Sequence, residues 1–185
     1  MSKMSYGVIM RFLFLVFVSF SLQSCFPPAT STLVGGQYEA KTNTTEYFIF
    51  PLGSVSLPGQ WVKGNYNSVS GQQWFKKDSI SLAIAFTQCD KYEFSKKDLK
   101  DFNFVKEYYE WDSKYLADTK KLTRQIIVSD SVNQYIIWRL FGDNFDNHFL
   151  FGNKNCAVHN YNVATKKWTE EEKVQFLQRL YLKKN

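Results

Sequence analysis

The chain has 185 residues, of which 18% are aromatic and 22% are charged, with a formal net charge of +6 at pH 7. A chain of this length can bury one sizeable core, and its many aromatic residues exclude an intrinsically disordered protein. The basic residues are scattered among acidic ones with no dense basic run, so we expect no nucleic acid among the partners.

The first predicted element is a short apolar segment near the N-terminus. Arg11 precedes the mostly apolar residues 12–22. At about 1.5 Å per residue this run is too short to cross a hydrocarbon core of about 30 Å. A short apolar run behind a positive residue is typical of a signal peptide. The alternatives for this segment are a buried N-terminal strand or helix and a secretory signal without lipid. The sequence leaves Met1, Met4 and Met10 open as the start of translation.

The segment Leu22-Gln23-Ser24-Cys25 resembles the lipobox of bacterial lipoproteins of the Bacteroidetes type. The resemblance implies a signal peptide over 1–24, cleavage before Cys25 and acylation of Cys25. Two or three acyl chains hold a protein stably on a bilayer. We therefore expect a lipid-anchored protein of the cell envelope, held in the bilayer through Cys25. The absence of an acidic run after this cysteine favours the outer membrane, facing the periplasm.

Residues 25–45 are predicted to be a flexible tether, since they contain Pro27, Pro28, Gly35-Gly36 and several Ser and Thr residues. A single domain is predicted over 46–185. Its first strands are predicted from apolar alternation and a Pro-Gly turn, at residues 47–50, 55–57, 72–75 and 79–87.

Two helices are predicted in the rest of the chain. The first runs from the N-cap Ser95 to about Lys120, with aromatic residues on one side and Asp112 among the charged residues of the other. The second follows Thr169-Glu170-Glu171-Glu172, which is a capping box. Between them, strands are predicted at 123–128, 133–141, 145–151 and 156–163, the last two as a hairpin around 152–155. This order predicts an α+β fold with a mostly antiparallel sheet.

The order of these elements is similar to that of the Mog1/PsbP-like fold. The similarity includes the segment Ser56-Leu57-Pro58-Gly59-Gln60-Trp61, the central aromatic helix, the strands ending in Phe149-Leu150-Phe151-Gly152 and the C-terminal helix. It covers roughly residues 46–185 and implies an α/β/α sandwich. Members of that family are mostly non-enzymatic binding or assembly modules, so the resemblance implies such a role. It assigns no functional residue in this sequence.

The three cysteines are Cys25, Cys89 and Cys156. If Cys25 is acylated, the other two lie in an oxidising compartment, where disulfides persist. A bridge between Cys89 and Cys156 would close a loop of about 68 residues and stabilise the fold by roughly 4 kcal/mol. The alternative is two buried reduced thiols that pack as small apolar side chains.

No motif of a metalloprotease, serine hydrolase, phosphate-binding loop or dithiol oxidoreductase is present. The predicted hairpin places the two histidines, His148 and His159, opposite each other, which makes them weak candidates for two ligands of a metal site. A third ligand is not evident, so we predict no metal, no cofactor and no catalytic residue. The simpler interpretation is a polar pair on a partly exposed sheet face.

Two short segments, Asp78-Ser79-Ile80 and Asp130-Ser131-Val132, resemble the acceptor motif of Bacteroidetes O-glycosylation. The resemblance makes Ser79 and Ser131 candidate glycosylation sites. Five tryptophans are many for a small domain. We expect these tryptophans to pack in the core, and the alternative is an exposed aromatic platform that binds a glycan or peptide.

The leading hypothesis from the sequence is a lipid-anchored envelope protein whose domain acts by binding, as an accessory to an envelope protein complex. The alternatives are an envelope hydrolase, a glycan- or small-ligand-binding protein, and a purely structural tethered domain.

Overall fold

The computed structural model describes residues 32–95 and 101–183, which belong to one compact unit that begins at Thr32. The predicted signal peptide, Cys25 and the tether residues before Thr32 lie outside the described residues. The helices are η1 (Cys89–Lys91), α2 (Asp101–Lys120) and α3 (Glu170–Leu182). The strands are β1 (Leu33–Gly35), β2 (Tyr38–Glu39), β3 (Thr44–Phe50), β4 (Gly53–Pro58), β5 (Val62–Asn67), β6 (Gln72–Lys77), β7 (Ile80–Gln88), β8 (Thr123–Asp130), β9 (Tyr135–Gly142), β10 (Phe145–Lys154) and β11 (Ala157–Ala164).

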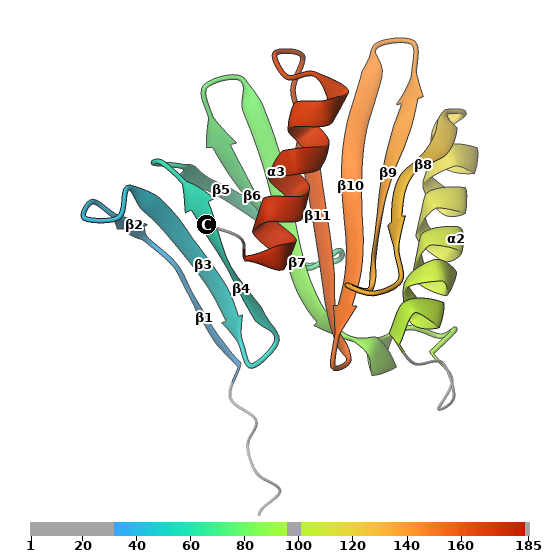
Figure 1. Ribbon diagram of the computed structural model, residues 1–185, viewed down its shortest axis with the longest axis horizontal. Coiled ribbons are helices and arrows are strands. Elements are labelled where there is room, and N and C mark those ends of the chain that lie inside the picture. Colours follow the sequence, from blue (N-terminus) through green and yellow to red (C-terminus); the bar gives the residue numbers. More distant parts are fainter. Residues whose placement is uncertain (1–31, 96–100, 184–185) are drawn as a thin grey trace, which may run out of the picture. The chain divides into compact units, whose positions relative to one another are not determined.

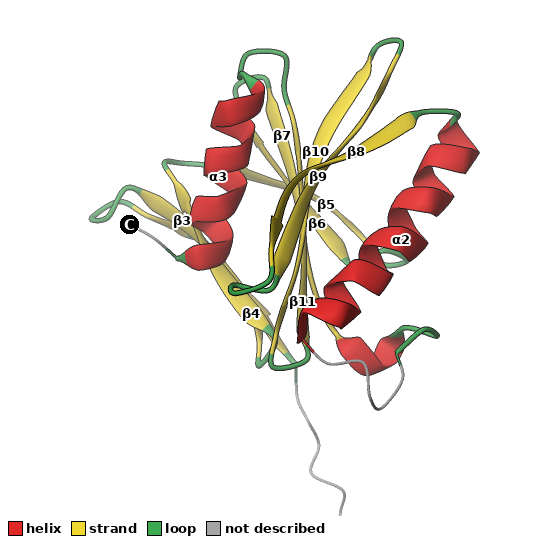
Figure 2. Ribbon diagram, turned by 45° about the vertical axis from the view of Figure 1, so that its right-hand side comes forward, coloured by secondary structure: helices red, strands yellow, loops and turns green. Residues whose placement is uncertain are grey.

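The strands form two antiparallel sheets. The large sheet has seven strands in the order β5-β6-β7-β11-β10-β9-β8, and the small sheet is built around β3, which pairs with β1, β2 and β4. Figure 1 shows α3 in front of the large sheet and the small sheet at the left, and Figure 2 shows α2 on the opposite side from α3. The predicted α+β class, with a mostly antiparallel sheet and two helices, is confirmed.

Each face of the large sheet has its own core. Along β7, Leu82, Ile84 and Phe86 alternate with small residues and point towards α3 and the small sheet. The neighbouring strands β9 and β10 send Trp138 and Phe149 to the other face, where they pack beneath α2. The period-two alternation of these strands therefore builds two apolar layers from one sheet.

The two helices begin and end for local reasons that the sequence encodes. At the start of α3, the Glu172 backbone N–H donates to the Thr169 hydroxyl over 3.2 Å, and the Thr169 N–H donates to the Glu172 carboxylate over 2.7 Å. The predicted capping box is therefore confirmed. Helix α2 ends at Lys120 as predicted. Ser95 is described, but residues 96–100, which would contain its capping partner, are not, so this cap stays a prediction. No helix of the described segments is long and apolar enough to span a membrane.

The folded part begins earlier than the predicted boundary at Glu46. Strands β1 and β2 pair with β3, so residues 33–45 are part of the small sheet and the tether prediction is wrong for them. Gly35 looked like a loop residue, but a Cβ atom there would collide with the ring of Phe48. Strands of two or three residues are too short to show an alternating pattern, which explains the error.

The tip of the β10–β11 hairpin also differs from the prediction. The turn residues are Asn155 and Cys156, both with positive φ (52° and 65°), as a two-residue hairpin turn requires. Gly152, which is predicted from the sequence to lie in the turn, lies within β10. A Cβ atom at Gly152 would collide with the ring of Tyr181 on α3, so this glycine permits close helix packing.

Candidate functional site

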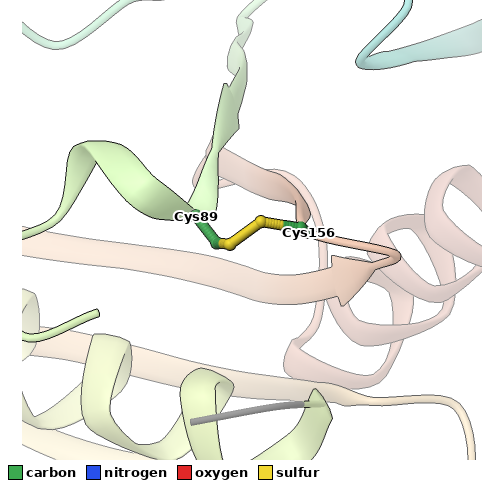
Figure 3. The surroundings of a disulfide bond; sticks show 2 residues. All are labelled: Cys89 and Cys156. Carbon is green, nitrogen blue, oxygen red and sulfur yellow. A yellow bond between two sulfur atoms is a disulfide. The ribbon is translucent and has the colours of Figure 1, made fainter. Parts of the chain in front are cut away.

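Cys89 and Cys156 form a disulfide, with their Cα atoms 5.0 Å apart. Figure 3 shows that the bond connects the end of β7 to the turn of the β10–β11 hairpin. The Cys89 backbone N–H also donates to the Cys156 carbonyl over 3.0 Å. Of the three cysteines, only Cys25 lies outside this bridge and outside the described residues.

The structure separates the two histidines that the sequence analysis paired. His148 lies opposite Val163, and His159 lies opposite Gly152. The predicted pairing is wrong because the hairpin turns at Asn155 and Cys156, which moves the register by four residues along the partner strand. Four residues of strand correspond to about 13 Å, so the two imidazoles cannot share one metal ion.

His148 lies in a network of charged side chains at the start of α3. Its ring is fully buried, with Asp146 3.8 Å from Nδ1 and Glu170 3.6 Å from Nε2. Arg139 pairs with Asp146 over 2.7 Å and with Glu170 over 3.4 Å. The nearly buried Lys173 donates to Asp146 over 2.8 Å. The network connects α3 to β9 and β10.

The surroundings of His148 favour its neutral form. Burial and the nearby Lys173 ammonium lower the pKa of His148, against the opposite effect of the carboxylates. For Asp146, burial raises the pKa, but the bonds from Arg139 and Lys173 outweigh it and the net shift is downward. Because the two carboxylates lie at opposite ends of the ring and each is already paired with a cation, the arrangement suits a structural brace. Among the described residues, no group of three or more His, Cys, Asp or Glu side chains is placed to hold a metal ion.

His159 belongs to the core between the large sheet and α3. Its Nδ1 atom is hydrogen-bonded to the Tyr161 hydroxyl over 2.7 Å. The imidazole packs edge-to-face on Phe86 and Tyr181, with ring centroids 5.0 and 5.3 Å apart. Burial lowers the pKa of His159 to about 3. The expectation of a partly exposed polar pair is therefore wrong for both histidines, which are buried.

The most prominent surface feature lies on the other side of the sheet. Five aromatic residues form what we call the aromatic surface: Tyr92, Phe94, Tyr108, Trp111 and Tyr115. Trp111 lies 5.9 Å from Tyr92 and 5.7 Å from Phe94, centroid to centroid. Trp111 is 52% exposed, and Tyr115, one helical turn further along α2, is 64% exposed. Trp61 and Trp138, by contrast, are core residues, as predicted.

A polar group of side chains borders the aromatic surface. The Asn160 side-chain N–H donates to the Tyr108 hydroxyl over 2.9 Å, and the hydroxyls of Tyr92 and Thr87 are 2.8 Å apart. The Asn160 side-chain oxygen is buried and has no hydrogen-bond partner among the described residues. Burial raises the pKa of Asp112 to about 6. This polar group therefore lies beside the exposed rings and contains one buried acceptor atom without a partner among the described residues.

The sequence does not indicate that Asp112 and Asn160 belong to this candidate site. Asp112 is predicted on the charged side of the helix, away from the aromatic residues. In the structure it lies near Tyr108: burial raises the pKa of Tyr108 most, and the charge of Asp112 raises it further. Asn160 lies on β11 and meets Tyr108 only through the tertiary fold. No local pattern signals such a contact, because the two residues are 52 positions apart.

Both candidate glycosylation serines lie in exposed turns. Ser79 is in the β6–β7 turn and Ser131 is in the β8–β9 turn. The Asp130 side chain accepts hydrogen bonds from the backbone of Val132 and Asn133, which shapes the second turn. Modification at either serine stays a prediction.

Comparison with known proteins supports the fold. No protein-family model matches the sequence, and no curated protein is significantly similar to it. The domain is similar to the solution structure of cyanobacterial PsbP (CyanoP) from Synechocystis, with a TM-score of 0.50. The match has 12% sequence identity and covers 85% of this chain and 95% of that chain. At this identity the likeness is one of fold, and it supports the PsbP-like resemblance noted from the sequence.

Proposed function

We propose that the protein is a lipid-anchored component of a bacterial cell envelope and that its α+β domain acts by binding. The lipobox at Cys25 supports the anchor. The disulfide between Cys89 and Cys156 supports an oxidising compartment, because such bonds persist there and are rare in reducing ones. Acylation of Cys25 and the outer-membrane, periplasm-facing location are parts of this proposal.

The exposure of Trp111 and Tyr115 carries the binding role. Large aromatic side chains on a single helix face are typical of contact surfaces, where they supply contact area at low conformational cost. The rings beneath them, Tyr92 and Tyr108, are 4.8 Å apart and fix the orientation of this surface. An exposed aromatic surface suits a protein partner, so we propose an accessory role in an envelope protein complex.

A second candidate is a glycan or another small polar ligand. The exposed Trp111 ring favours it, because a sugar ring could stack on this indole. An envelope hydrolase is the enzymatic version of the same idea. Asp112, with a pKa of about 6, would be its candidate proton donor.

The test is a pull-down of the native lipoprotein from detergent-extracted membranes, read by mass spectrometry. Two variants accompany it: Cys25→Ser, which removes the proposed anchor, and Trp111→Ala with Tyr115→Ala, which removes the aromatic surface. A matched control is Tyr66→Ala, since Tyr66 is an equally exposed aromatic residue (56%) on β5.

The expected result is an envelope protein that co-purifies with the native chain and the Tyr66 control and is lost from the Trp111 and Tyr115 variant. Intact mass should show acyl chains on the native form and none on Cys25→Ser. If the same proteins co-purify with every form, the aromatic surface is not the binding site. If no protein co-purifies but glycan fragments bind the isolated chain in a Trp111-dependent way, the second candidate replaces the first.

A further inference from the structure

An exposed apolar patch lies where the chain enters the domain. Leu33 and Phe50 are 61% and 64% exposed. Together with Phe48 we call them the entry patch. We propose that the entry patch rests on the anionic surface of the bilayer that holds Cys25, so that the domain lies against the membrane. This inference depends on the lipid anchor of the proposed function.

The register of the small sheet makes the patch continuous. Leu33 pairs with Phe50 across β1 and β3, so both side chains lie on the same face. Gly35 pairs with Phe48 on that face, and the missing side chain lets the Phe48 ring lie against it. Tyr47 and Ile49 point the other way, into the core. The outer face of β3 therefore ends in apolar side chains that the described fold leaves uncovered.

The length of chain before the patch ties it to the membrane. Cys25 precedes Leu33 by eight residues, and eight residues span at most about 28 Å when fully extended. If Cys25 is anchored, the start of β1 cannot leave the vicinity of the headgroups. Figure 1 shows that the start of β1 and the β3–β4 turn lie at the same, lower end of the small sheet. The patch thus lies at the end of the domain that the anchor holds nearest to the bilayer.

One lysine beside the patch, Lys183, suits an anionic surface. Ser54 lies opposite Phe48 on β4, and the Lys183 ammonium donates to its hydroxyl over 3.1 Å. Along β3 the first carboxylate beyond the patch is that of Glu46, which accepts a hydrogen bond from Ser56 over 2.7 Å. A lysine at the rim and apolar side chains at the centre are typical of interfacial membrane contacts.

The test uses the mature chain from residue 25 with Cys25→Ser, so that binding cannot come from acyl chains. Its binding to vesicles of phosphatidylcholine with 30% phosphatidylglycerol is measured by co-sedimentation. Leu33→Ser with Phe50→Ser should weaken binding about tenfold, which corresponds to about 1.4 kcal/mol. The matched control is Val69→Ser with Val132→Ser, which removes two apolar side chains that are even more exposed (97% and 87%) from turns of the large sheet. The control should bind like the parent.

Lys183→Glu should weaken binding to the anionic vesicles and leave binding to pure phosphatidylcholine unchanged. Circular dichroism of each variant shows whether it is folded. If the parent does not bind anionic vesicles, or if the Leu33 and Phe50 variant binds as well as the control, the inference is overturned. Intact mass of the native protein tests the anchor separately. An unacylated Cys25 with patch-dependent vesicle binding would refute the lipoprotein proposal and retain the patch as a membrane surface.

Discussion

The two faces of the large sheet differ in where they place their polar and aromatic side chains. On the α3 face, the buried His159 and Lys173 have partners within the fold, and the buried His148 lies between two carboxylates. On the α2 face, aromatic rings continue from the core to the solvent, and the Asn160 oxygen is buried without a partner among the described residues. The α3 face also holds buried polar atoms without a hydrogen-bond partner among the described residues, namely both ring nitrogens of His148 and the Tyr47 hydroxyl. The two faces therefore differ in the exposure of their aromatic rings, which reach the solvent on the α2 face. We infer that the α3 face stabilises the domain and that the α2 face binds.

The largest effect should follow from a cavity on the α3 face. Leu177 is fully buried in the core between α3 and the two sheets. Leu177→Ala should lower the free energy of unfolding by about 3 kcal/mol, from lost burial and the cavity that remains. Urea denaturation followed by circular dichroism measures this. A loss below about 1 kcal/mol would mean that this face relaxes easily, and the contrast between the faces would weaken.

Acid should act on the α3 face next most strongly. His159 has a pKa of about 3 in the folded state and an ordinary value of about 6.5 when unfolded. Between these values the unfolded chain binds the extra proton, so stability is fully present above about pH 6.5 and falls as the pH decreases. The expected loss is about 2 kcal/mol between pH 6.5 and pH 5. The lowered pKa of His148 acts in the same direction.

Replacing His159 by glutamine separates this effect from general acid denaturation. The variant should be less stable than the parent at pH 7.5, because the bond to Tyr161 is perturbed, yet its stability should depend less on pH between 6.5 and 5. Urea midpoints at several pH values give the comparison. Identical slopes for both proteins would show that His159 does not titrate in this window.

Asp112 on the α2 face should behave in the opposite way. Its folded-state pKa of about 6 lies above the ordinary value of 3.8. The charged carboxylate therefore lowers the stability of the domain at neutral pH, and the domain regains this stability when acid protonates the group. Asp112→Asn should stabilise the domain at pH 7 by about 1 kcal/mol after allowance for solvent screening, with the gain fading towards pH 4. Asp118→Asn on the same helix is the control, because Asp118 is exposed. A destabilised Asp112→Asn would show that the carboxylate has a structural partner.

Long periodic elements of this fold could be predicted from the sequence, and short ones could not. Helix α3 was predictable because the capping box at Thr169–Glu172 and the apolar residues at helical spacing after it are local signals. Strand β5 was missed because its six residues are all exposed and show no alternation. The register of the β10–β11 hairpin was missed because the role of Gly152 depends on Tyr181, which lies 29 positions further along the chain. The aromatic surface and its polar border could not be predicted for the same reason, since Tyr108 meets Asn160 only in the folded domain.

The smallest effect on stability should come from Trp111, and this is the sharpest test of the contrast. Trp111→Ala removes an indole that is 52% exposed and touches its neighbours only at the edge of the core. It should therefore cost at most about 1 kcal/mol in urea denaturation. Partner or ligand binding should nevertheless be lost, while Tyr66→Ala should change neither quantity. If Trp111→Ala instead destabilises the domain as much as Leu177→Ala, the exposed rings are part of the core, and the two faces do not divide stability from binding.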